Sequence, residues 1–279
     1  MAAISLAGIF IYPVKSLHGI ALSEASVVGR RLPGDREWML VDQDSRFMHQ
    51  RDYPQMARLR VALTDHGLVM GAPGQTDLLV VRPTPDVPVE FVRLWRRLAP
   101  VRSVTRLADA WFTTALGVPA RLVAFAPGVP SREGPNWEAD ASLQDATPFH
   151  VTCHDSLTDL NRRSGHPVPM NRFRPNLVLT GGAPYAEDTW QDVLIGQIPL
   201  HWIKPCTRCK MTMTDQETGA RPSGEPLRTL ATYRRLGSEV VLGHYFTASA
   251  DGVLKVGDPV QVLTIHDPPV FSSASPAAP

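Results

Sequence analysis

The stretch ARLRVALTDHGLVMGAP, residues 57–73, predicts a β-hairpin. Polar or small residues at 58, 60 and 62 alternate with Leu59, Val61 and Leu63. A period of two is typical of a strand with one buried face. Asp65-His66-Gly67 interrupts the alternation with residues that favour a tight turn. A β-structure is therefore expected around this stretch.

The segments on either side extend the same pattern. Strand-like runs rich in β-branched and apolar residues, bounded by Gly, Pro or Asp, are typical of a β-domain. On this basis roughly the first 100 residues are predicted to be mostly β. The runs are Ile4 to Tyr12, SEASVVGRRL (23–32), WMLVDQDSRFMHQ (38–50), DLLVVRP (77–83) and VPVEFVRLW (87–95).

Two short helices are predicted downstream. The first covers Leu107 to Leu116, with Asp109 as the capping residue and Gly117 as the stop signal. The second follows Asp155 and ends at Gly165. The other segments are predicted as strands: ARLVAF (120–125), FHVTC (149–153), PNLVLTGG (175–182), DVLIGQIPLHWIKP (192–205) as a β-pair turning at Gly196, and GVLKVGDPVQVLTI (252–265) as another pair.

These elements predict an α+β, β-rich fold with two β-barrel-like halves and a few short helices. A chain of 279 residues is long enough for two domains. The Pro- and Gly-rich connector PGVPSREGPNWEADAS (127–142) is the best candidate for a junction. We therefore expect domains at 1–125 and 126–265. Residues 266–279 have the composition of a disordered tail.

Composition excludes several classes of protein. A net charge of +1 lacks the basic field of a dedicated nucleic-acid binder. No run approaches the ~20 apolar residues of a membrane helix. Three cysteines without a signal peptide indicate a reducing compartment, so a soluble cytoplasmic protein is expected.

The segment KPCTRCKMT, residues 204–212, contains Cys206 and Cys209 as a C-x-x-C pair. A zinc site needs further paired ligands, and Cys153 is isolated. A thioredoxin-like pair begins a helix, whereas residues 211–219 look β-like and then turn. A single thiolate for a soft metal fits the neighbouring basic residues, because positive charge favours the thiolate. Two buried cysteines in a strand remain the alternative.

Three clusters could hold an anionic ligand. Lys15 and Ser16 follow the first strand, and lysine binds phosphate as a point charge. Arg36 would form either a surface ion pair or a phosphate clamp. Arg174 and Asn176, two apart before a strand, could face one planar or phosphorylated ligand. Alternatively, arginines 172 and 174 brace a turn.

Eight motifs follow one another along the chain: YPVKS (12–16), DREW (35–38), DLNRR (159–163), NRFRPNLVLTGG (171–182), YAEDTW (185–190), CTRCKMTMTDQETG (206–219), EPLRTL (225–230) and VGDPV (256–260). Together they resemble those of MOSC proteins with an N-terminal MOSC β-barrel domain, especially the amidoxime-reducing components of mitochondria and their bacterial counterparts. The resemblance covers roughly residues 4–265 and implies two intertwined domains: the MOSC N-terminal domain at 1–125 and the MOSC domain at 126–265.

This resemblance implies a molybdenum cofactor, Mo-molybdopterin, in the groove between the domains; pyridoxal phosphate is not expected. Cys209 would bind the metal, and Asp145 would line the catalytic side of the pocket. The remaining cofactor-binding positions implied by the resemblance are Lys15, Ser16, Arg36, Thr147, Arg174, Asn176, Thr207, Arg208 and Tyr245.

The activity implied is reduction of N-hydroxylated or other N-oxo or S-oxo small molecules. Mitochondrial relatives carry an N-terminal anchor and some bacterial relatives a C-terminal ferredoxin domain. Neither is expected in this chain, so a separate protein of the ferredoxin, flavodoxin or cytochrome b5 type would deliver electrons. The alternative is a molybdenum-cofactor or sulfur carrier without turnover of its own.

Overall fold

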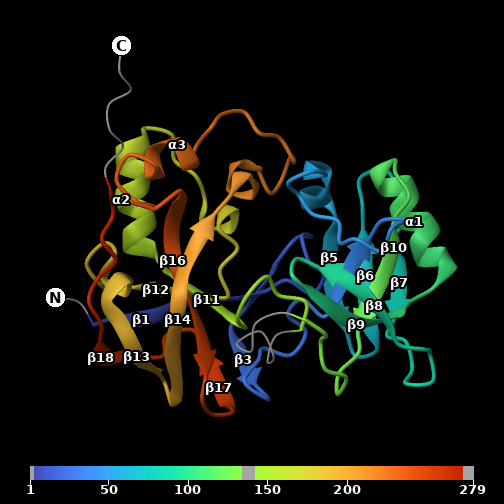
Figure 1. Cartoon of the computed structure of the whole chain (residues 1–279), viewed down its shortest axis with the longest axis horizontal. Coiled ribbons are helices and arrows are strands. Elements are labelled where there is room, and N and C mark those ends of the chain that lie inside the picture. Colours follow the sequence, from blue (N-terminus) through green and yellow to red (C-terminus); the bar gives the residue numbers. More distant parts are fainter. Residues whose placement is uncertain (1–2, 134–141, 273–279) are drawn as a thin grey trace.

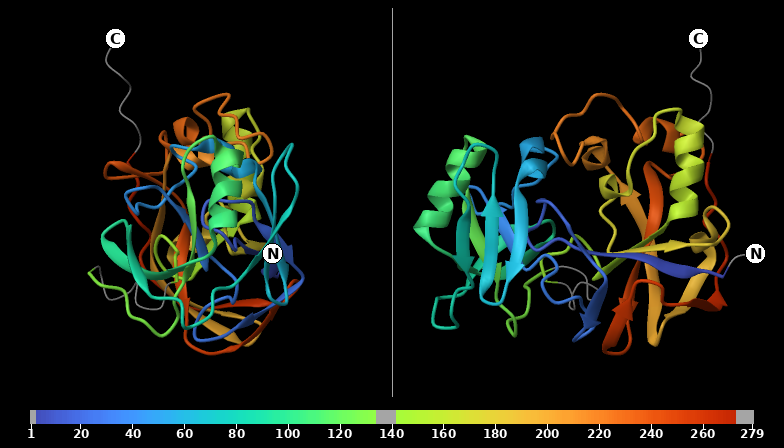
Figure 2. Two further views of the ribbon diagram at one scale, coloured as in Figure 1. Left: turned by 90° about the vertical axis from the view of Figure 1, so that its right-hand side faces the viewer. Right: turned by 180° about the vertical axis from the view of Figure 1, so that it is seen from behind.

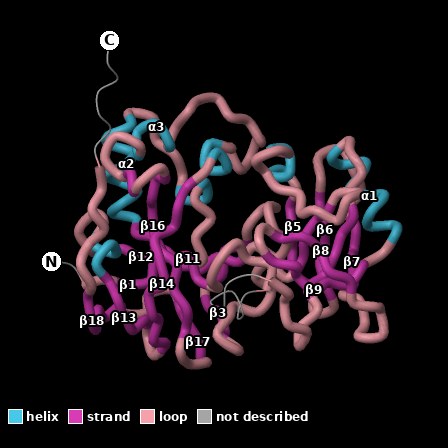
Figure 3. Tube along the Cα trace, viewed as in Figure 1, coloured by secondary structure: helices cyan, strands magenta, loops and turns pink. Residues whose placement is uncertain are grey.

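The chain folds into two lobes, and the N-terminal strand lies in the same lobe as the C-terminal half of the chain (Figure 1). The structure, a computed structural model, describes residues 3–133 and 142–272. The view from behind shows the same division, whereas the lobes overlap in the side view (Figure 2). Strands dominate both lobes, and helices lie mainly at one end of each (Figure 3). The expected α+β, β-rich fold is confirmed.

The larger lobe is built on one nine-stranded sheet, in the order β18-β13-β14-β16-β11-β12-β1-β2, with β15 paired to β16. A two-stranded β17-β3 ribbon accompanies it. The strands are β1 (Ser5–Ile11), β2 (Ile20–Leu22), β3 (Glu24–Val27), β11 (Phe149–Cys153), β12 (Leu177–Thr180), β13 (Trp190–Ile195), β14 (Ile198–Arg208), β15 (Arg235–Leu236), β16 (Glu239–Ala248), β17 (Gly252–Lys255) and β18 (Val260–Ile265).

The smaller lobe holds a four-stranded sheet, in the order β4-β10-β9-β8, and the three-stranded meander β5-β6-β7. The predicted hairpin is confirmed as β5 and β6, which pair from Arg60↔Gly71 to Thr64↔Gly67. The strands are β4 (Trp38–Val41), β5 (Arg60–Thr64), β6 (Gly67–Gly71), β7 (Leu78–Val81), β8 (Glu90–Leu94), β9 (Arg97–Ser103) and β10 (Arg121–Phe125).

The first strands of the chain belong to the larger lobe, where they pair with strands from the C-terminal half. β1 pairs with β12 and β2, and β3 pairs with β17. Apolar side chains of β1 therefore join a core with those of β11 and β13; Ile9, Val151 and Val193 are fully buried there. Burial of this apolar surface fixes the N-terminal segment onto the second lobe.

Three α-helices complete the described part of the fold: α1 (Arg106–Leu116), α2 (His154–Ser164) and α3 (Leu227–Leu230). The glycine stop signals are confirmed, since Gly117 and Gly165 adopt left-handed C-cap conformations. Asp109 as the N-cap is wrong. The Thr105 hydroxyl accepts from the Ala108 N–H instead, and the Asp109 carboxylate accepts from the Leu122 N–H of β10 at 2.8 Å.

The prediction that residues 252–265 form a β-pair is wrong in its pairing. Both strands exist, but β17 pairs with β3 and β18 with β13. The connection between them hydrogen-bonds to β1: the Gly257 N–H donates to the Leu6 carbonyl at 2.7 Å. Strand propensity identifies such segments, whereas the partner depends on contacts far away in sequence.

Residues 211–219 were expected to be β-like and then to turn; the β-like part is wrong, and the turn is confirmed. A 3-10 helix, Lys210–Met213, follows β14, and a turn held by the Asp215 carboxylate comes next. Other 3-10 segments are Pro54–Arg58, Met170–Arg172 and Ala186–Thr189. In the expected tail, the Ser272 N–H donates to Arg235 O, while residues 273–279 lie outside the described part. Positions 134–141 of the expected junction also lie outside it.

Candidate active site

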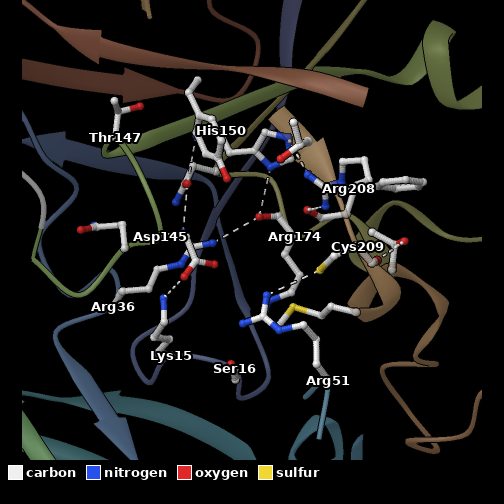
Figure 4. Close-up of a pocket in the computed structure, with 17 residues that line it drawn as sticks. Lys15, Ser16, Arg36, Arg51, Asp145, Thr147, His150, Arg174, Arg208 and Cys209 are labelled. Atoms are coloured by element: carbon white, nitrogen blue, oxygen red, sulfur yellow. Dashed lines mark hydrogen bonds and ion pairs between the residues drawn. The ribbon is translucent and has the colours of Figure 1, made fainter. Parts of the chain in front are cut away.

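A pocket between the two lobes contains every site residue expected from the sequence (Figure 4). The pocket and the solvent-open space at its mouth together measure about 720 Å³. Lining residues come from two stretches of the chain, four of them from positions 15–51 and the others from positions 144–245. They are Lys15, Ser16, Arg36, Arg51, Gln144, Asp145, Thr147, His150, Phe173, Arg174, Asn176, Thr207, Arg208, Cys209, Met211, Thr212 and Tyr245.

The two cysteines of the C-x-x-C pair occupy different environments. Cys209 is exposed in the pocket wall, at the end of β14, and its Sγ lies 3.7 Å from Arg51 Nη1. Cys206 is buried, and its Sγ lies 2.6 Å from Arg208 Nη1. Across residues 3–133 and 142–272 no group of three or more His, Cys, Asp or Glu could hold a metal. Of the two cysteines in the pair, Cys209 is the one with an exposed thiol.

Lys15 lies at the base of the pocket as the buried partner of a part-buried ion pair. Its Nζ donates to Asp145 Oδ1 at 2.5 Å and to the Leu143 carbonyl at 2.9 Å. Burial lowers the pKa of Lys15 from 10.5 to about 8, although Asp145 opposes the shift. Burial disfavours the ionised Asp145, but Lys15 and the Trp95 indole N–H outweigh it and hold the pKa of the carboxyl well below 3.8. Because the Asp145 side chain is 43 % exposed, solvent weakens this pair.

A second buried network orients Arg36. Its Nη1 donates to both oxygens of Asp35, at 2.7 and 2.8 Å, and to Asn176 Oδ1 at 3.0 Å. Arg36, whose side chain is 13 % exposed, is therefore paired with a buried carboxylate rather than in a surface ion pair. Arg174 stacks over Tyr12 at 4.1 Å. Burial lowers the pKa of Arg174 to about 10 and raises that of Tyr12 to about 12.

The turn-bracing alternative describes Arg172 fully and Arg174 in part. Arg172 donates to the Met213 carbonyl at 2.7 Å and to Asp215 at 3.0 Å, so it fixes the segment after β14. Arg174 also donates to this segment, to Gln216 at 3.2 Å, but its side chain lines the pocket. These two arginines of one motif therefore have different roles.

Backbone strain coincides with three of the predicted ligand-binding residues. Ser16, Arg36 and Arg174 have φ values of 67°, 47° and 55°. Non-glycine residues rarely adopt this left-handed region, which costs ~1–2 kcal/mol per residue. Strain held in place by surrounding structure is often found at functional sites. Here it turns three polar side chains toward a common space.

Neutral groups complete the wall near the cysteines. The His150 ring accepts from Arg208 Nη1 at 3.4 Å through Nε2, and its Nδ1 lies 3.5 Å from the Arg174 carbonyl. Burial and the charge of Arg208 lower the pKa of His150 well below 6.5, so the ring is neutral. Burial, with Cys206 nearby, raises the pKa of Tyr245 well above 10. Both shifts favour the uncharged forms of these two side chains.

Six lining residues were missed from the sequence. Gln144, Phe173, Met211 and Thr212 adjoin motif residues, so their neighbours were the available signal. His150 lies in the predicted strand 149–153, and its sequence does not show which face of that strand points into the pocket. Arg51 belongs to no motif and reaches the pocket only because the smaller lobe folds against Cys209.

Comparison with known families matches residues 3–119 to the MOSC N-terminal beta barrel domain and residues 138–261 to the MOSC domain. The chain is 33 % identical to human mitochondrial amidoxime-reducing component 1, over 93 % of this chain and 83 % of that protein. The mouse protein of the same name is 32 % identical over 93 % and 82 %.

The chain belongs to the MOSC family, in the group with an N-terminal MOSC β-barrel domain.

Among solved structures, YUAD of Bacillus subtilis covers 93 % of this MOSC protein and 94 % of itself, with 9 % identity and a TM-score of 0.41. That likeness is too slight to carry an argument. No helix within the described ranges is long and apolar enough to cross a membrane.

The donor set of the pocket fits the cofactor that the family implies. Five cationic side chains face a single carboxylate, Asp145, so an anionic ligand would be favoured. Three buried donor atoms, Thr147 Oγ1, Arg208 Nε and Arg51 Nη2, have no hydrogen-bond partner within the described part of the chain. Such atoms are costly unless a ligand or water satisfies them. The cations are Lys15, Arg36, Arg51, Arg174 and Arg208.

Proposed function

We propose that this MOSC protein is a molybdenum-cofactor-dependent reductase of N-hydroxylated small molecules, with electrons supplied by a separate redox protein. The observation that carries the proposal is the exposed thiol of Cys209 in a basic pocket between the lobes. The relatives named as amidoxime-reducing components support the reaction class.

The residues divide the task by chemistry. Cys209 would supply the metal ligand, since molybdenum accepts a soft thiolate. Lys15, Ser16 and Arg36 would bind the phosphate and pterin from the smaller lobe, and the larger lobe would add the rest of the contacts. Those are Arg174 and Asn176 at the pterin, Thr207 and Arg208 beside the thiolate, and Asp145, Thr147 and Tyr245 toward the metal side.

The bound cofactor would supply two-electron redox chemistry, and the protein would supply binding, orientation and charge. Reduction of an amidoxime breaks the N–O bond, takes two electrons from the redox partner and two protons, and yields an amidine and water. Lys15, with its pKa near 8 and its Nζ beside Asp145, can hold a proton within the pocket near neutral pH. The buried Tyr245 hydroxyl stays protonated and can donate a hydrogen bond.

The decisive experiment measures molybdenum and pterin in protein from a cofactor-producing host, together with reduction of an aromatic amidoxime by a chemical electron donor. Cys209→Ser is expected to lose molybdenum and activity. Cys206→Ser, which removes the buried thiol, is the matched control and should retain the metal. The opposite ranking of the two variants would refute the assignment of the ligand.

Loaded protein that reduces no N-oxygenated compound would favour the alternative, a cofactor or sulfur carrier. The exposed Cys209 thiol is the feature that would also suit this role. A persulfide on Cys209, detected by mass spectrometry, would distinguish a sulfur carrier from a cofactor carrier.

A further inference from the structure

Two buried glutamines bind each other across the lobes beside the pocket. Gln50 follows β4 in the smaller lobe, and Gln216 lies in segment 210–221 after β14, which reaches the smaller lobe (Figure 1). Gln50 Nε2 donates to Gln216 Oε1 at 3.1 Å, and Gln216 Nε2 donates to Gln50 Oε1 at 2.9 Å. This reciprocal pair of amides, the glutamine clasp, joins the lobes through side chains to which the function proposed above gives no role.

Each glutamine also binds a residue that the proposed function assigns to the cofactor. Gln50 Nε2 donates to the Ser16 carbonyl at 2.8 Å, and Gln216 Oε1 accepts from Arg174 Nη1 at 3.2 Å. Ser16 and Arg174 both have left-handed backbones, with φ values of 67° and 55°. Such a conformation persists only where surrounding contacts hold it. The clasp therefore supports one strained binding residue from each of the two stretches that line the pocket.

Within the described ranges, no hydrophobic core secures segment 210–221 to the smaller lobe. The hydrophobic clusters of the described residues include none of this segment. The ion pair between Arg60 and Glu217 spans the contact, but its side chains are 64 % and 56 % exposed, so solvent weakens it. The two clasp glutamines are buried, and a buried amide is costly when it loses its partner. Loss of the clasp should therefore loosen the segment.

A second anchor would keep the lobes in contact without the clasp. Arg221 Nη1 donates to the Arg51 carbonyl at 3.0 Å, and Arg221 Nε donates to Thr214 Oγ1 at 2.8 Å. Neither acceptor belongs to a clasp glutamine, so replacement of the glutamines leaves this anchor in place. Variants of the clasp should therefore fold, with a segment 210–221 that opens more often.

We infer that Gln50 and Gln216 are positioning residues that close the pocket around its anionic cofactor. While the clasp is formed, Ser16 and Arg174 keep the conformations that face the ligand, and segment 210–221 stays against the smaller lobe. When the clasp opens, both binding residues lose their support and the cofactor leaves faster. The identity of the cofactor rests on the function proposed above, whereas opening of the segment can be measured on protein without cofactor.

The first test is hydrogen exchange of the cofactor-free protein, followed by peptide mass spectrometry. Gln50→Leu removes the partner of two buried groups, the Gln216 amide and the Ser16 carbonyl. A loss of this kind shifts an equilibrium roughly 5- to 150-fold. Exchange in peptides from segment 210–221 should therefore accelerate at least about fivefold, while peptides from β12 keep the wild-type rate.

Gln55→Leu is the matched control, because that amide donates to the Leu116 carbonyl within the smaller lobe. Its exchange rate in segment 210–221 should equal that of the wild type. An unchanged rate in Gln50→Leu would overturn the inference. Equal acceleration throughout the chain would also overturn it, since the glutamine would then stabilise the whole fold rather than the closed segment.

The second test follows the release of molybdenum from the loaded enzyme by elemental analysis over time. Gln50→Leu and Gln216→Leu should each release the metal at least about fivefold faster than the wild type. The rate increase in the double variant should be smaller than the product of the two single increases, because either change opens the same clasp.

An increase equal to that product would show two independent contributions and overturn the clasp. Wild-type release from Gln50→Leu, despite faster exchange, would overturn its role in holding the cofactor. Absence of molybdenum from the wild type would instead refute the proposed function, and the exchange rates would still decide whether the glutamines close the segment.

Discussion

Replacement of Lys15 by Met should change how the stability of the protein depends on pH. Lys15 is 5 % exposed, and its pKa falls from 10.5 to about 8 on folding. Between these values the unfolded chain binds more protons than the folded one, so the free energy of unfolding rises with pH. At pH 7 both states are protonated, and burial of the charge costs the fold roughly 3 kcal/mol, at about 1.36 kcal/mol per pKa unit.

The same pKa values predict that this penalty falls by roughly 2 kcal/mol between about pH 7.5 and pH 9.5. Urea unfolding of the cofactor-free protein at several pH values measures it. The stability of the wild type minus that of Lys15→Met should rise by that amount over the interval. Lys255→Met, which removes an amine 62 % exposed and paired with Glu24, gives the baseline for losing a lysine charge.

A flat difference between wild type and Lys15→Met would show that the buried amine pays no such cost, and the electrostatic description of the pocket would be refuted. A bound anion should remove the rise as well, because it would raise the pKa of Lys15 toward its ordinary value. Repeating the titration with saturating inorganic phosphate would check this.

Three further substitutions test the surroundings of the pocket. Asp145→Asn removes the counter-charge that raises the pKa of Lys15, so the alkaline rise in stability should begin at a lower pH than in the wild type in the same urea titrations. Gly243→Ala should lower the free energy of unfolding, measured with urea, by about 2–4 kcal/mol. At φ 75° the new Cβ would lie 2.6 Å from His150 Nε2 and 2.7 Å from a backbone oxygen. Gly237→Ala is the control: its φ is 60° but the space around it is open, so it should cost only ~1–2 kcal/mol. Asp188→Asn should cost roughly 3 kcal/mol and lower Tm, since it leaves a buried arginine and histidine without their shared carboxylate; an unchanged Tm would contradict this.

Local patterns were sufficient for most elements of the fold. The alternation around residues 57–73 predicted the β5–β6 hairpin, and the glycines at 117 and 165 predicted where two helices end. The prediction of the N-cap of α1 was wrong, because more than one residue near that helix end has a side chain suited to capping. Thr105 and Asp109 are both residue types that cap helices. Thr105 is the N-cap, because the Asp109 carboxylate accepts a hydrogen bond from the Leu122 N–H of β10 instead.

The site residues were expected from short motifs and from the resemblance to a family, and the structure brings all of them to one pocket. Motifs select residues by type and spacing, so they do not show which of two cysteines reaches the pocket. The exposure of Cys209 and the burial of Cys206 follow from the path of β14 into the 3-10 helix.

The amino-acid sequence by itself determined the β-rich class and the chemical types gathered for an anionic ligand, because strand periodicity and charge are local properties. Only the tertiary structure decided that β1 joins the sheet of the second half, that β17 and β18 separate, and that Arg51 stands over Cys209. Sheet partners and pocket neighbours depend on contacts between segments distant in the chain. The free energy of those contacts comes from burial, and burial arises only when distant segments pack against each other in the folded state.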